Sequence, residues 1–207
     1  PVYDPDADNK AGNLAHHLQV LSKDLTKAAN VAGQRPYGAD LQALLLSALA
    51  QTLWSWTGEQ QNVVAVERHG RLGAVSAPDR AVGWFTAVAP IVVSAGSDKD
   101  CICQTKDALA LSADIAPSYN AWRLETGAKG ALLAFNHLGQ EENNQSPFNV
   151  DMSRSGLSMG PASPIEADIT LLSYIRDDQL HLDWEYAGER LTEETIKRLA
   201  AHLSHAL

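Results

Sequence analysis

The feature that most constrains the fold is an alternating segment near the end of the sequence. Residues 180–186 read Leu-His-Leu-Asp-Trp-Glu-Tyr, so that apolar and polar side chains take turns. This is the pattern of a strand with one buried face. A second apolar run at 167–175 precedes it, and the polar residues 176–179 lie between the two runs. The segment therefore predicts two antiparallel strands of a sheet.

Helical patterns accompany these strands. Residues 39–57 carry apolar side chains at three- and four-residue steps, and Gly58 stands where a helix C-terminal glycine belongs. Thr192 predicts the N-cap of a final helix. The other expected elements are strands at 14–21, 63–66, 85–93 and 130–136, helices at 22–30, 98–112 and 119–125, and a loop at 33–38. The mixture predicts an α+β architecture with helices packed on a mixed β-sheet.

Length bounds the number of domains. A chain of 207 residues suits one domain, or one large lobe of a bigger one. Its start is polar and rich in Asp and Pro, which predicts a linker or frayed N-terminus over residues 1–13. Residues 14–207 are expected to form the folded unit.

Charge and cysteine usage narrow the partners and the compartment. Acidic residues outnumber basic ones 25 to 16, which disfavours nucleic acid and an anionic membrane surface. No apolar run approaches the ~20 residues of a membrane span. Cys101 and Cys103 are too close for an unstrained disulfide, and they lack partner ligands at zinc-site spacing. A reducing cytoplasm is the natural interpretation.

Three segments hold candidate functional residues, and the first is Glu67-Arg68-His69-Gly70-Arg71. It follows the apolar run 63–66, and strand ends are where enzymes place reactive groups. A carboxylate that enters a partly apolar cleft has a raised pKa and can serve as a general base near neutral pH. The alternative is a solvated strand end with a local Glu–Arg ion pair.

The other two segments are 82–86 and 135–140. The first reads Val-Gly-Trp-Phe-Thr, which predicts a bend at Gly83 followed by a core strand that buries the aromatic rings. In the second, Asn136 can donate two hydrogen bonds and His137 can donate or accept. Aimed at a thioester carbonyl, such donors would stabilise an enolate. The alternative is a strand end with a turn at Gly139.

In order along the chain, these segments resemble the signature motifs of epimerization domains of nonribosomal peptide synthetases, which belong to the condensation-domain superfamily. The family's Glu-Gly-His-Gly-Arg-Glu corresponds to residues 67–72, where Leu72 replaces the final Glu. Val-Gly-Trp-Phe-Thr is matched at 82–86. Phe-Asn-Tyr-Leu-Gly-Gln corresponds to 135–140, so His137 replaces a Tyr. The resemblance extends from about Leu14 onward.

The resemblance implies a fold and a reaction. The fold would be a chloramphenicol-acetyltransferase-like lobe, the C-terminal one of two lobes with a tunnel between them. An aminoacyl or peptidyl thioester, carried on the 4'-phosphopantetheine of a peptidyl carrier protein, would enter this tunnel. Two-base proton transfer would then invert its Cα, with no metal and no cofactor bound directly.

The resemblance also implies roles for residues. Glu67, Asn136 and His137 would serve catalysis. The residues implied in substrate binding are His69, Arg71, Trp84, Phe85 and Thr86. The second catalytic group, a histidine in His-His-x-x-x-Asp-Gly, belongs to the N-terminal lobe, and His16-His17 does not match that motif. We therefore expect this chain to be inactive until the N-terminal lobe completes it.

Two other functions stay open. One is a condensation-type acyltransferase lobe that forms an amide, and the other is a non-catalytic module that docks a carrier protein. Only an epimerase exchanges the Cα hydrogen with solvent, and a docking module would be indifferent to Glu67→Gln.

Overall fold

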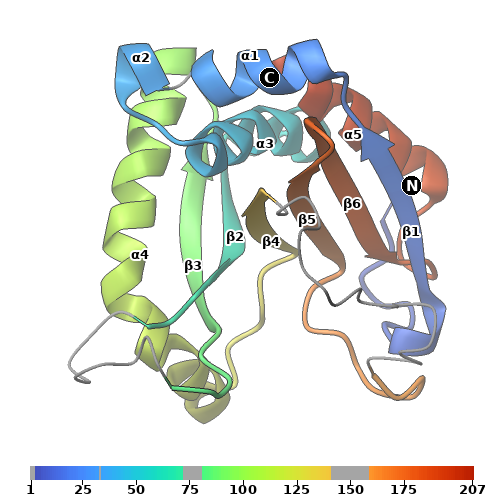
Figure 1. Ribbon diagram of the computed structural model, residues 1–207. Coiled ribbons are helices and arrows are strands. Elements are labelled where there is room, and N and C mark those ends of the chain that lie inside the picture. Colours follow the sequence, from blue (N-terminus) through green and yellow to red (C-terminus); the bar gives the residue numbers. More distant parts are fainter. Residues whose placement is uncertain (1–2, 33, 72–80, 141–158) are drawn as a thin grey trace.

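One mixed sheet organises the molecule. The computed structural model describes residues 3–32, 34–71, 81–140 and 159–207. Its six-stranded sheet has the order β1-β6-β5-β4-β2-β3 (Figure 1). The strands are β1 Leu14–Val20, β2 Gln61–Arg68, β3 Ala87–Ser94, β4 Leu133–Gln140, β5 Ile169–Arg176 and β6 Gln179–Ala187. The helices are α1 Lys23–Ala32, α2 Gln34–Tyr37, α3 Leu41–Thr57, α4 Asp98–Thr126 and α5 Glu193–Ala206, with a 3₁₀ turn at Ala11–Asn13. The predicted α+β class with helices on a mixed sheet is confirmed.

The β5–β6 hairpin forms as the alternating pattern predicts. Asp177 and Asp178 connect the strands with φ angles of 52° and 63°, the positive values that a two-residue hairpin turn requires. Leu180, Leu182 and Trp184 are fully buried, while the intervening side chains lie on the other face. Parallel pairing joins β4 to both β5 and β2, and antiparallel pairing joins the remaining neighbours.

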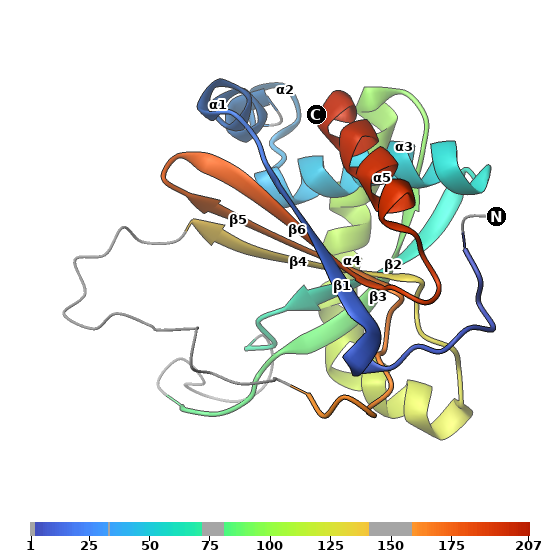
Figure 2. The same ribbon diagram turned by 90° about the vertical axis from the view of Figure 1, so that its right-hand side faces the viewer.

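Helices α3 and α5 cover one face of the sheet (Figure 2). The side chain of Asp40 accepts a hydrogen bond from the Ala43 amide and caps the start of α3. Gly58 ends that helix with a φ of 76°, as the sequence predicts. The largest fully buried side chains belong to this layer and to the strands beneath it: Leu45, Leu46, Leu49, Leu53, Leu133, Phe135, Leu171 and Trp184. Within the described ranges, no helix combines the length and apolar character that a bilayer crossing requires.

Two helical predictions were wrong in extent. Residues 98–126 form the single helix α4, although Pro117 suggested a break between two helices. A proline removes one N–H donor, but α4 continues past it and ends at Gly127, whose φ is 65°. The expected loop at 33–38 contains the short helix α2.

Two strand predictions also need correction. Strand β3 begins at Ala87 rather than at residue 85, and Trp84 is 89% exposed. The expectation that its ring is buried in a core strand was therefore wrong, because the chain reaches the sheet only after this segment. Strand β4 continues to Gln140, with an irregular register after His137 and a positive φ at Gly139. Leu72 lies outside the described residues.

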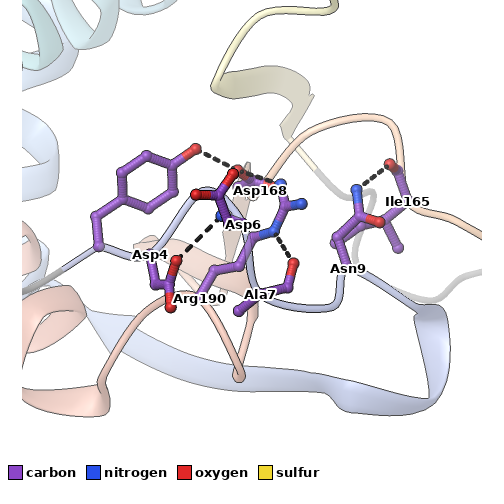
Figure 3. Close-up of polar contacts among 8 residues, drawn as sticks. Asp4, Asp6, Ala7, Asn9, Ile165, Asp168 and Arg190 are labelled. Carbon is purple, nitrogen blue, oxygen red and sulfur yellow. Dashed lines mark hydrogen bonds and ion pairs between the residues drawn. The ribbon is translucent and has the colours of Figure 1, made fainter.

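The chain start from residue 3 onward is attached to the body rather than frayed (Figure 3). The Tyr3 hydroxyl donates to Asp168 at 2.6 Å, and Arg190 donates to both oxygens of the same buried carboxylate at 2.8 and 3.0 Å. Arg190 also donates to the carbonyl of Ala7. Burial, together with the Asp168 charge, raises the pKa of Tyr3 to about 12. The interpretation of residues 1–13 as a linker or frayed end thus differs from what residues 3–13 show.

Candidate functional site

The site lies where two neighbouring parallel strands stop pairing. The β2–β4 ladder joins Val64 to Leu133, Ala65 to Ala134 and Val66 to Phe135, and it ends there. Glu67 and Asn136 occupy the next positions, and their side chains make the contact that the backbones no longer make. The Asn136 Nδ2 donates to Glu67 Oε2 at 2.7 Å. The carboxyl ends of parallel strands are a recurrent place for binding sites in mixed α/β sheets.

The environment of Glu67 alters its acidity. Its side chain is half-buried, and burial raises its pKa above the ordinary value, with a further contribution from the negative charge of Glu166. The hydrogen bond from Asn136 opposes this effect, because a donor favours the ionised carboxylate. A carboxylate with a raised pKa is a stronger base than an exposed one.

A polar cleft opens at this end of the strands. It has a volume of about 370 Å³, and its lining includes His69, Thr86 and Asn136 beside Glu67. Arg68 also borders it, but its guanidinium donates to the Leu109 carbonyl and to Ser112, each at 2.7 Å. The alternative of a local pair between Glu67 and its neighbouring arginine is therefore not what the structure shows.

The first two sequence segments lie against each other. Gly70 has a φ of 53°, and a Cβ there would collide with the carbonyl oxygen of Phe85. The guanidinium of Arg71 lies 4.1 Å from the centre of the Phe85 ring and donates to the Ala81 carbonyl. Of the five residues implied in substrate binding, His69 and Thr86 line the cleft. Arg71 and Phe85 support that wall, and Trp84 is exposed.

His137 lies on the opposite face of β4 from Asn136. Consecutive side chains of a strand point to opposite faces, and His137 pairs with Ser173, a buried residue on the helix-covered face. Its Nδ1 is 2.9 Å from the Ser173 hydroxyl, and burial lowers its pKa. His137 nevertheless lines the same cleft as Glu67 and Asn136, although its Nδ1 contacts Ser173. The catalytic role of His137 stays a prediction.

Two residues near the site have no counterpart in the sequence predictions. Arg123 on α4 donates to Glu166 across 3.0 Å, and Glu166 in turn raises the pKa of Glu67. The two partners are 43 positions apart. No local pattern links them, so only the folded chain identifies the pair. Within the part of the chain that the structure describes, no group of three or more His, Cys, Asp or Glu side chains is arranged to hold a metal ion.

Known structures place the fold in the chloramphenicol-acetyltransferase-like class. The epimerization domain from the third module of tyrocidine synthetase B has a TM-score of 0.81 and 24% identity, covering 100% of this chain and 50% of that one. The first condensation domain of the CDA synthetase has a TM-score of 0.67 and 16% identity, covering 97% of this chain and 46% of that one.

Residues 5–207 match the model of the condensation domain, and the chain belongs to that family. One of the linear gramicidin synthase polypeptides of Brevibacillus parabrevis is 28% identical over 100% of this chain. One of the plipastatin synthase polypeptides of Bacillus subtilis is 32% identical over 81% of it. The chain spans 3% and 7% of the lengths of these two polypeptides, and half of the solved epimerization domain.

Proposed function

We propose that this chain is the C-terminal lobe of an epimerization domain, which inverts the Cα of an aminoacyl or peptidyl thioester. The observation that carries the proposal is the half-buried carboxylate of Glu67. Its Oε2 accepts a hydrogen bond of 2.7 Å from Asn136 Nδ2, just beyond the last paired residues of β2 and β4. A base of this kind suits the removal of a weakly acidic proton beside a thioester carbonyl.

The proposed reaction needs two groups on opposite sides of the substrate carbon. Glu67 takes the Cα proton, the C–H electron pair moves into the enolate, and a second acid on the other face returns a proton to the carbon. In the reverse direction the two groups exchange roles. Asn136 holds the carboxylate through one amide N–H and has a second N–H available to the enolate oxygen. The second acid would come from the N-terminal lobe.

The cleft would hold the substrate arm. Its polar lining, with His69 and Thr86, suits the amide groups of a 4'-phosphopantetheine chain attached to a peptidyl carrier protein. The carrier protein and the N-terminal lobe are therefore the proposed partners. The lobe itself would bind no further cofactor, because the carrier brings the reactive thioester.

The family also supports a second candidate, a condensation-type acyltransferase lobe. Its support is the match of residues 5–207 to the condensation domain. Amide formation requires a second carrier-bound amine and leaves the hydrogen on Cα in place. The two reactions therefore differ in their products, and a docking module would form neither product.

The test uses the complete domain, in which this lobe is joined to its N-terminal lobe, and a carrier protein loaded with an L-aminoacyl group. We expect a D/L mixture after cleavage of the thioester and chiral chromatography. Glu67→Gln should reduce the rate of inversion by about 10²–10⁴-fold, the usual contribution of a general base. Glu59→Gln is the matched control, because Glu59 is an exposed carboxylate just before β2, and its rate should be unchanged.

Each outcome separates the candidates. An amide product with a second loaded carrier, without inversion, would assign condensation instead. Carrier binding without either product would assign a docking module. Inversion catalysed by the isolated 207 residues would contradict the proposal that the second acid comes from the N-terminal lobe.

A further inference from the structure

Glu67 lines two separate hollows. One is the polar cleft beyond the end of the β2–β4 ladder. The other lies on the face of the sheet that α3 and α5 leave uncovered, and it has a volume of about 210 Å³. A substrate carbon beside this carboxylate therefore lies at the junction of two spaces with different linings.

Small side chains form the floor of the second hollow. Ala65 pairs with Ala134, and Ala134 pairs with Thr170, so the three residues lie in one row across β2, β4 and β5. All three line the hollow. The residues of the same three strands that face the helices include Val66, Phe135 and Leu171, which are fully buried. The hollow exists because this row carries small side chains where larger ones would fill the space.

The walls of the hollow are mostly apolar, but the charged residues of its lining are three carboxylates and one arginine: Glu67, Glu166, Glu185 and Arg123. Val88, Ile165 and the Tyr119 ring contribute to the walls. The Arg123–Glu166 pair spans 3.0 Å at the border, and a Cβ at Gly130 would lie 2.9 Å from the Arg123 guanidinium. Glu185 also lines the hollow, and its Oε2 lies 3.5 Å from His16 Nε2. An anionic substrate group would therefore be repelled by the excess of carboxylates over arginine in this lining.

The contrast between the two spaces assigns the parts of a substrate. Amide groups lose several kcal/mol when they are buried without hydrogen bonds, so a pantetheine arm requires the polar cleft. An apolar side chain gains from leaving water and suits the hollow. Pockets for drug-sized ligands usually measure about 300–1,000 Å³, so a hollow of about 210 Å³ is suited to one side chain.

We infer that this hollow binds the side chain of the residue whose Cα proton Glu67 removes, and that it favours an apolar side chain over an anionic one. The inference rests on the proposed epimerase function. Ala65, Ala134 and Thr170 are then specificity-determining residues, because their small size sets the depth available to the substrate.

The experiment compares carrier proteins loaded with L-Leu, L-Ala and L-Glu in the complete domain, with inversion as the readout. The wild-type domain should invert L-Leu at least about tenfold faster than L-Glu, expressed as kcat/KM. In Ala134→Leu, kcat/KM for L-Leu should fall at least about tenfold, while the value for L-Ala should change less than about threefold. Pocket contacts of one or two methylene groups discriminate by this much.

Two variants guard against indirect effects. Ala201→Leu adds the same side chain at an exposed position on α5, and it should leave the L-Leu to L-Ala ratio unchanged. Ala65→Val is a smaller change in the same floor, and it should lower the L-Leu to L-Ala ratio even if Ala134→Leu destabilises the lobe. Thermal unfolding of each variant reports whether it is folded.

The outcomes separate a failure of the side-chain inference from a failure of the proposed epimerase function. Equal losses for L-Leu and L-Ala in both floor variants would overturn the inference and leave the epimerase proposal intact. Equal wild-type rates for L-Leu and L-Glu would also overturn it. Absence of inversion with every loaded carrier would overturn the proposed function, and the inference with it.

Discussion

The two faces of the sheet use the same strands for different purposes. On the face covered by α3 and α5, Leu182 and Trp184 are completely buried in a close-packed layer. On the other face, the half-buried Glu67 and small residues such as Ala134 line a hollow. The close packing of apolar side chains explains the choice of residues on the first face. The second face keeps space and a carboxylate with a raised pKa, which packing alone would not favour.

The largest expected effect is on the free energy of unfolding, and it compares a leucine on the helix-covered face with a leucine on the open face. Leu182→Ala should lower the free energy of unfolding by about 2–5 kcal/mol, because it leaves a cavity in the core. Leu18→Ala removes the same atoms from a side chain that is 52% exposed, and it should cost less than about 1 kcal/mol. Urea unfolding measures both values. Equal losses would show that the two faces do not differ in packing.

The Asp168–Arg190 pair extends the comparison to buried polar contacts. Arg190→Met should lower the free energy of unfolding by about 2 kcal/mol, because the Asp168 carboxylate would stay buried without its charged partner. Lys10→Met breaks an exposed pair with Asp8 and should cost at most about 0.5 kcal/mol. Urea unfolding again gives both values. A negligible effect of Arg190→Met would mean that the pair does not hold the chain start.

The raised pKa of Tyr3, whose hydroxyl donates to Asp168, predicts that the stability of the protein changes at alkaline pH. The pKa of Tyr3 is raised to about 12 in the folded state, so its protonated form favours folding. That contribution is complete below pH 10, the ordinary pKa of the phenol, and it is lost as pH rises through about 12. Urea unfolding of the wild type should therefore show an alkaline loss of stability that Tyr3→Phe reduces. Identical losses in the two proteins would remove Tyr3 from this account.

Glu67→Gln tests whether the open face is arranged for function rather than stability. A carboxylate whose pKa is raised on folding stabilises the fold below its unfolded pKa, and this stabilisation is lost as pH rises through the folded pKa. Glutamine does not ionise and can still accept from Asn136. The stability of the variant relative to the wild type should therefore increase from pH 4 to pH 8. A decrease over this range would contradict the raised pKa.

The smallest effect concerns the charge of Glu166. Its negative charge contributes to the raised pKa of Glu67, so Glu166→Gln should lower that pKa. The rise of kcat/KM with pH should then move to lower pH, by less than about one unit because Glu166 is largely exposed. Glu189→Gln, an exposed carboxylate elsewhere, should leave the profile in place. A shift to higher pH would contradict the electrostatic assignment.

Local patterns in the sequence predicted the elements more reliably than their contacts. Residues 39–57 and 180–186 have strong periodicity and matching end signals, and both elements formed as expected. Trp84 was misplaced because aromatic character suggests burial, whereas this residue precedes the strand and is exposed. The sequence predicts separate helices at 98–112 and 119–125 on either side of Pro117, whereas a single helix continues to Thr126 and is capped by Gly127.

The site was predictable in part. The motifs around Glu67 and Asn136 singled out both residues, and they meet across 69 positions of sequence. His137 lines the same cleft, but strand alternation directs its side chain to the opposite face of β4, where it contacts Ser173. The Arg123–Glu166 pair and the hollow could not be predicted, because they depend on how α4 and the segment before β5 meet over the sheet.

The most direct test of the central claim follows hydrogen exchange at the substrate carbon. The complete domain is incubated in D₂O with an L-aminoacyl carrier protein, and mass spectrometry measures deuterium at Cα. The account predicts that the wild-type domain introduces one deuterium per inversion, and that Glu67→Gln introduces it at least about a hundredfold more slowly. Exchange at the wild-type rate in Glu67→Gln would contradict the assignment of this carboxylate as the base.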